Sequence, residues 1–185
     1  MMKIVTKDIA HANLSGTKPI NTLYRMGRKY GRVERPELKY LLVVSEPDVW
    51  MVNLADKTGE HVVDPGPTFV FKPCILPPLE NGLHSPSLLD FEFGREHEFM
   101  KACNAIKGGE SVEGKQYDSL TVDKDGYSIT LLSHAGKDKP FRITANKGKD
   151  IAVSLEYLEY ESNLEPQMDL FKPPADVKIK EAKKP

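Results

Sequence analysis

The 185-residue chain contains only two cysteines, Cys74 and Cys103, and neither lies in a C-x-x-C pair. Such a chain is not a disulfide scaffold, and the spacing of its cysteines offers no zinc or redox motif. One bridge between the two thiols and two unrelated buried thiols both fit the sequence. The five histidines occur singly. The sequence therefore predicts no metal site and no cofactor.

A charge excess and long apolar runs are also absent. The 26 Lys and Arg residues nearly balance the 27 Asp and Glu residues, which gives no global attraction to nucleic acid. No apolar run approaches the roughly 20 residues that span a bilayer, and the opening MMKIVTKDIA has no apolar stretch typical of a secretory signal. We therefore expect no nucleic-acid partner and no transmembrane segment.

The sequence contains many short strand patterns separated by Gly- and Pro-containing turns. Such patterns occupy residues 3–14, 20–27, 28–36, 38–45, 48–54, 60–64, 68–76, 115–123, 127–135, 139–146 and 151–162. One helix is predicted over residues 95–106, because Phe99, Cys103 and Ile106 follow helical spacing. The irregular stretch before it is rich in Pro, Gly and Ser.

Together these patterns predict a mainly antiparallel β protein of the α+β class. We expect a strongly curved, unclosed β-barrel of about ten strands in a single domain of residues 1–185. The irregular arm and helix of residues 77–108 are expected to lie between two blocks of strands and to cover the concave face.

Catalytic motifs are missing: the sequence has no G-x-S-x-G, no P-loop and no H-E-x-x-H. The acid–histidine cluster Glu60, His61 and Asp64 is the nearest substitute. Alternate residues of a strand share a face, so His61 should point away from both acids. We expect His61 to be a polar position beside a hairpin turn, and His97 to be a solvated helix residue.

The apolar side chains of the strands are the remaining candidates for a site. A curved sheet with one helix has few elements to cover its concave face, which must be packed, covered by the arm or occupied by an apolar ligand. The candidate ligand-binding residues are Tyr24, Tyr40, Leu42, Trp50, Val52, Leu54, Phe69, Phe71, Phe99, Ile129, Leu131 and Phe141.

A second surface is the basic hairpin of residues 25–35, with five Lys and Arg residues interleaved with tyrosines and flanked by Glu34 and Glu37. The adjacent acids favour a solvated hairpin face over a nucleic-acid site. The same surface could bind a protein partner.

The order of segments resembles the LolA/LolB superfamily of bacterial envelope proteins, the outer-membrane lipoprotein carriers and their relatives. The similarity rests on TLYRMGRKYGRVE, on LLVVSEPDVWMVNLADKTGEHV and on the ending DLFKPPADVKIKE, in which Asp169, Phe171 and Pro174 match a loose family pattern. The resemblance implies an unclosed β-barrel that holds acyl chains under capping helices, in the periplasm or at the outer membrane.

The resulting hypothesis is a non-enzymatic envelope protein that binds an apolar ligand, such as a lipid, an acyl chain or a lipoprotein, and takes part in its transport. It would be periplasmic or outer-membrane-associated, with its leader removed. The alternatives are a protein-interaction or sensor module of the envelope and a hydrolase with a dispersed site.

Overall fold

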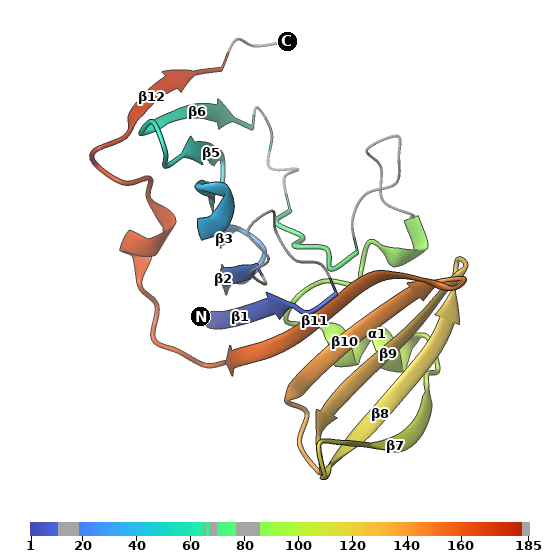
Figure 1. Cartoon of the computed structure of the whole chain (residues 1–185). Helices are drawn as coiled ribbons and strands as arrows, with labels where there is room; N and C mark the ends of the chain where they lie inside the picture. The colour runs from blue at the N-terminus through green and yellow to red at the C-terminus, as the bar shows by residue number, and fades with distance from the viewer. Residues whose placement is uncertain (11–18, 65, 67–69, 77–85, 183–185) are drawn as a thin grey trace. The chain divides into compact units, whose positions relative to one another are not determined.

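The computed structural model describes residues 1–10, 19–64, 66, 70–76 and 86–182. Within these ranges it has twelve strands, one α-helix and three short 3-10 helices (Figure 1). The strands are β1 (Met2–Asp8), β2 (Ile20–Met26), β3 (Tyr30–Arg35), β4 (Tyr40–Ser45), β5 (Asp48–Asn53), β6 (Thr58–Val63), β7 (Ile106–Val112), β8 (Lys115–Lys124), β9 (Tyr127–His134), β10 (Pro140–Lys147), β11 (Asp150–Glu161) and β12 (Lys178–Glu181). The helices are η1 (Pro36–Leu38), η2 (Pro86–Leu88), α1 (Glu96–Ala102) and η3 (Met168–Phe171).

The chain divides into two compact units. Unit 1 comprises Met1–Val5, Pro19–Phe71 and Glu161–Pro185, and unit 2 comprises Thr6–Lys18 and Lys72–Tyr160. The strand order is β12-β6-β5-β4-β3-β2-β1 in unit 1 and β1-β11-β10-β9-β8-β7 in unit 2, with β1 crossing the boundary. The strands β12 and β7 stand at the two ends of this order. The single-domain organisation stays a prediction.

In unit 1, strands β2 to β6 are consecutive antiparallel partners, because each turn between them is short. Residues in register share a face of the sheet. One row across the sheet consists of Tyr24, Arg32, Val43, Trp50, His61 and Glu181. The neighbouring row on this face contributes Leu41 and Val52. We call this surface the strap face.

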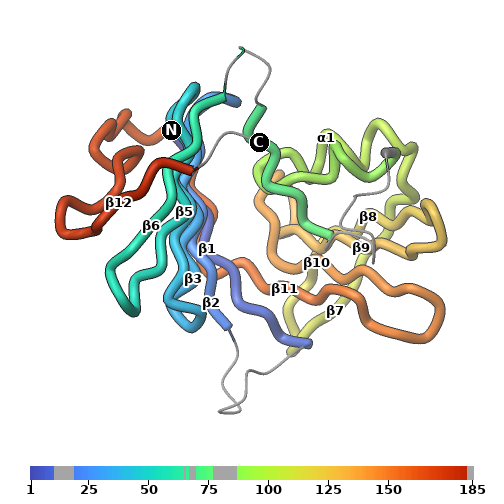
Figure 2. Tube along the Cα trace, turned by 90° about the horizontal axis from the view of Figure 1, so that it is seen from above, coloured from blue at the N-terminus to red at the C-terminus, as the bar shows by residue number. Residues whose placement is uncertain are grey.

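The C-terminal strap, residues 161–182, lies on the strap face. Val177 and Ile179 pack against a buried cluster of Leu41, Val43 and Val52. The strap ends in β12, which pairs in parallel with β6, and Figure 2 shows the two strands side by side. Thus the chain's own C-terminal strap covers the apolar cluster on the strap face.

In unit 2, strands β7 to β11 form an antiparallel series. Ile129, Leu131, Ile143 and Ala145 are neighbours on one face, and each has 0% of its surface exposed. The helix α1 is joined to β9 by a hydrogen bond between His97 and Ser133, and its Phe99 and Met100 are buried. Figure 1 shows α1 against this series of strands.

The fold prediction is confirmed in its coarse form, a mainly antiparallel β protein with one α-helix, but twelve strands exceed the expected ten. Two strands were missed. The predicted irregular arm and helix of residues 77–108 extend into β7, in which Gly108 and Gly109 pair with Ser119 and Asp118 of β8. The predicted strand patterns end at residue 162, whereas residues 178–181 form β12.

Two other expectations were wrong in detail. The segment 70–76 is not a strand and makes only an isolated bridge at Cys74; residues 68 and 69 lie outside the described ranges. The helix ends at Ala102 because Asn104 takes a positive φ of 54°. Phe99 lies in the helix and is buried, but Ile106 begins β7 and is 77% exposed.

Candidate functional site

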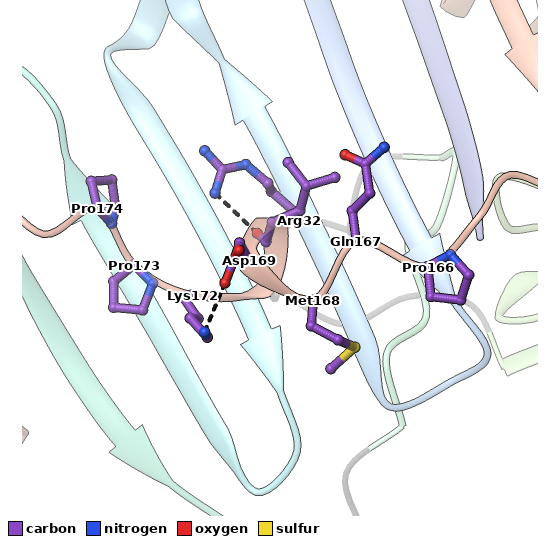
Figure 3. A pocket seen from close by; sticks show the side chains of 9 residues that line it. Arg32, Pro166, Gln167, Met168, Asp169, Lys172, Pro173 and Pro174 are labelled. Atoms are coloured by element: carbon purple, nitrogen blue, oxygen red, sulfur yellow. Dashed lines mark hydrogen bonds and ion pairs between the residues drawn. The ribbon is translucent and has the colours of Figure 1, made fainter.

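A groove lies along the C-terminal strap of unit 1. It has a volume of about 580 Å³ and is widely open to solvent. Figure 3 shows Arg32 projecting from β3 towards the strap, while the other side chains follow one another along it. The lining residues, which we call the strap groove, are Arg32, Pro166, Gln167, Met168, Asp169, Leu170, Lys172, Pro173 and Pro174.

Two ion pairs set the charge of the strap groove. Lys172 Nζ lies 2.7 Å from Asp169 Oδ1, and this ammonium group lowers the pKa of the Asp169 carboxyl. Arg32 Nε donates to Glu34 Oε1 at 2.5 Å, and its Nη1 donates to the carbonyl oxygen of Leu170 at 3.0 Å. The groove therefore carries balanced charges beside the apolar surfaces of three prolines and Met168.

The wall of the groove is anchored by the residue that follows Leu170. Phe171 is 1% exposed, and its ring centroid lies 5.5 Å from that of Tyr30 on β3. This buried ring and the Arg32 hydrogen bond fix the η3 turn on the sheet. The flanking Met168 is 44% exposed and belongs to the groove surface.

His61 has a carboxylate at each ring nitrogen. Its Nδ1 lies 2.8 Å from Glu181 Oε1, and its Nε2 lies 2.8 Å from Asp48 Oδ1. The ring stacks on Trp50, with centroids 5.1 Å apart and planes 11° apart. The hydrogen bond to Glu181 is the main cause that raises the pKa of His61, with Asp48 adding to it and partial burial opposing it.

This arrangement favours the imidazolium, in which both nitrogens donate. An imidazolium has no lone pair with which to accept a proton or to bind a metal ion. The alternation argument is confirmed for Glu60, which lies on the opposite face of β6 to His61. Asp64 follows the end of β6, so the register does not test it. His61 was expected to be only a polar position beside a turn, but it contacts the carboxylates of Asp48 and Glu181.

In unit 2 a carboxyl group is buried at the start of α1. Glu96 is 0% exposed and accepts hydrogen bonds from the Gly94 amide at 2.9 Å, the Tyr157 hydroxyl at 2.8 Å and the Tyr160 hydroxyl at 3.3 Å. Burial raises the pKa of Glu96. Burial and the adjacent Glu96 raise the pKa of the Tyr157 phenol well above its ordinary value. These groups satisfy one another and join α1 to β11.

His97 was expected to be solvated, and this is wrong. Its Nε2 lies 2.8 Å from Ser133 Oγ, and the half-buried setting lowers the pKa of the ring. The two cysteines are free thiols. In the described ranges, no three His, Cys, Asp or Glu side chains are arranged to hold a metal ion.

The predicted apolar set of unit 1 is divided between two faces of the sheet. Trp50 and Val52 lie on the strap face, together with Tyr24. Tyr40 and Leu42 are register partners of Asn53 and Met51 and lie on the opposite face.

Other members of the set also differ in their surroundings. Leu54 lies in the turn after β5 and is 38% exposed, and Phe69 lies outside the described ranges. Phe71 is buried against Gly31: a Cβ at that position would lie 2.4 Å from the ring.

In unit 2, Phe99, Ile129 and Leu131 are buried, while Phe141 stacks on Tyr117 with centroids 4.1 Å apart. The buried members are covered by the chain's own side chains. An apolar-ligand cavity lined by this set therefore stays a prediction.

The basic hairpin is not one solvated surface. Arg25 is 7% exposed, and its Nε donates to the carbonyl of Gly27 at 3.0 Å. Arg32 donates a hydrogen bond to the Leu170 carbonyl of the strap. The side chains of Arg28, Lys29 and Arg35 are exposed. Sequence reasoning missed the strap groove, because it arises from contacts between residues 32 and 170, far apart in the chain.

No helix among the described residues could cross a membrane, since α1 has only seven residues.

No family model matches the chain. No curated protein matches it either. Among solved structures, the chain is similar to an uncharacterised conserved protein from Thermus thermophilus, with a TM-score of 0.57, 10% identity, and coverage of 98% of this chain and 90% of that one. This likeness shows the fold alone. A structure of PNGF-II matches with a TM-score of 0.33 and 8% identity; the chain spans 30% of that protein's length. The kinship to LolA/LolB proteins stays a prediction.

Proposed function

We propose that this chain is a non-enzymatic binding protein that holds a short extended segment of a polypeptide partner in the strap groove. The observation that carries the proposal is the strap groove itself. It has a volume of about 580 Å³ and is lined by a strap that is anchored to the sheet. Volumes of this size are typical of sites for small ligands and short peptides.

The chemistry of the groove supports a peptide ligand. Its prolines and Met168 offer apolar surface, while Gln167 offers an amide that can donate and accept hydrogen bonds. The charges of Arg32 and Lys172 are offset by Glu34 and Asp169. A uniformly charged ligand gains little from such a surface, whereas a peptide presents apolar side chains and amide groups together.

Preorganisation also supports the proposal. Phe171 is buried and Arg32 donates to the Leu170 carbonyl, so contacts within the chain fix the groove-lining part of the strap on the sheet. A preformed site avoids the entropy of ordering a loop on binding. The acyl-chain hypothesis makes a different prediction, because its ligand would have to displace side chains such as Ile129 and Leu131 that are already fully buried.

The test is a random-peptide array probed with the labelled protein. The sequences that bind are then synthesised, and their dissociation constants are measured by fluorescence anisotropy. We expect dissociation constants in the micromolar range, and Met168→Ser and Lys172→Ala each to weaken binding by about three- to tenfold.

The matched control for Lys172 is Lys101→Ala. The two lysines are 67% and 68% exposed, each facing an aspartate, but Lys101 lies in unit 2. Peptides that bind equally well to all variants would place the site elsewhere. The absence of any binding peptide, together with tight uptake of a fluorescent fatty acid, would replace the proposal with the acyl-chain hypothesis.

A further inference from the structure

We propose that the C-terminal strap is a pH-dependent latch: protonated His61 clamps β12 to the sheet, and loss of this proton frees the end of the strap. The latch concerns the strap itself and does not require that the strap groove bind a ligand.

The first observation is the position of β12. It is a four-residue end strand whose neighbour in the strand order is β6. The backbone hydrogen bonds at the two ends of this pairing run from the Lys178 amide to the Lys57 carbonyl and from the Ala182 amide to the His61 carbonyl, both at 2.9 Å. Parallel pairing of so short a strand contributes little stability by itself. Side-chain contacts must supply the rest.

The second observation is that His61 joins three strands. It lies on β6 and contacts Asp48 of β5 and Glu181 of β12, both at 2.8 Å. Its side chain is 15% exposed, so these contacts are only partly screened by solvent. A neutral ring can donate through one nitrogen only, and the other would face a carboxylate with a lone pair. Deprotonation therefore costs one of the two contacts.

Among the described residues, the charged groups that face His61 are its two carboxylate partners, and no cation there could take over the role of its ring proton. From β5 the facing groups are Asp48 and the Trp50 ring, and from β12 the facing group is Glu181. On the same face, β4 carries no charged side chain, and Arg32 of β3 is paired with Glu34. The lysines of β12 alternate with Glu181 and Ile179 and so point to the other face.

A further ion pair of the strap, between Lys57 and Asp176, is separate from the latch. Lys57 Nζ lies 2.7 Å from Asp176 Oδ2, and each side chain is more than 60% exposed. The hydrogen bond with Asp176 raises the pKa of Lys57, which keeps this lysine charged throughout the range in which a histidine titrates. It therefore contributes no pH dependence there.

The direction of the pH effect follows from linkage. The pKa of His61 is higher in the closed strap than its ordinary value of 6.5. The closed state binds more protons, so the latch is at full strength below about pH 6.5 and weakens as the pH rises through the raised pKa. The strap is thus closed in mildly acidic solution and looser in mildly alkaline solution.

The experiment is hydrogen exchange of the full chain, expressed as protection factors for the amides of Lys178 and Ala182 between about pH 6 and about pH 9. We expect these factors to fall by about three- to tenfold across this range, while those of β3 and β4 stay constant. In His61→Gln the factors should be low and independent of pH. His134→Gln, an exposed histidine of unit 2, should behave like the wild type.

Glu181→Gln is the second variant, because Glu181 is 75% exposed and its replacement leaves the core intact. It should reduce the pH dependence by half or more. Protection factors of β12 that do not change with pH in the wild type would overturn the latch. Unchanged pH dependence in both His61→Gln and Glu181→Gln would overturn it equally.

Discussion

Replacing Gly31 by alanine tests whether the Phe71 ring is tightly packed against the sheet or lines a cavity. A Cβ at Gly31 would lie 2.4 to 2.5 Å from three ring atoms of Phe71. Phe71 is 4% exposed, so its ring has little room to retreat. Overpacking of this kind costs about 1 to 3 kcal/mol. If the ring instead lined an empty or ligand-filled cavity, it would swing aside at little cost.

The control for this substitution is Gly109→Ala in β7. The nearest atom to a Cβ there is the Tyr117 carbonyl oxygen at 3.7 Å, an ordinary contact. Since alanine restricts the unfolded chain more than glycine does, this change should be neutral or stabilising by up to about 1 kcal/mol.

Urea unfolding followed by circular dichroism measures both variants. We expect Gly31→Ala to lower the free energy of unfolding by about 1 to 3 kcal/mol relative to the wild type. Equal stabilities for Gly31→Ala and Gly109→Ala would refute the packing argument and would favour Phe71 as a cavity-lining residue.

Three further predictions follow from buried groups. Phe171→Ala should cost about 3 to 5 kcal/mol in unfolding free energy, because it empties the site against Tyr30, and should speed tryptic cleavage of the strap. Glu96→Gln should gain stability relative to the wild type as the pH rises above 4.5, since burial raises the pKa of this carboxyl and its ionisation opposes folding; denaturant titrations at two pH values measure this. At about pH 8 Cys74 should react with a disulfide reagent more slowly than free glutathione does, because burial and Glu92 raise the pKa of its thiol.

The sequence was informative wherever structure is local. The sequence predicted the hairpin of β5 and β6, because alternation and the polar residues between the two strands are local signals. The turn lies at residues 54–57, and β6 begins at Thr58, before the strand pattern of residues 60–64. Alternation along β5 gives Trp50 and Val52 a common face, whereas Leu54 lies beyond the end of the strand. Alternation could not show that Tyr40 and Leu42 lie on the other face, since the register between β4 and β5 depends on the turn at Pro47.

Contacts between residues far apart in the chain could not be predicted from the sequence. Glu181 meets His61 across 120 positions, and only the parallel pairing of β12 with β6 brings them together. The strand β12 itself has four residues, mostly charged, which is typical of a solvated tail. The strap groove has the same origin, because Arg32 and Leu170 meet through the packing of η3 on the sheet.

The most direct test of the central proposal is to record amide chemical shifts of the labelled protein while an array-selected peptide or a fatty acid is added. We predict that the peptide shifts the amides of Gln167, Met168, Asp169 and Lys172, and that the fatty acid shifts none of these. Shifts at Phe99, Ile129 and Leu131 on adding the fatty acid, with no response of the strap to any peptide, would contradict the proposal.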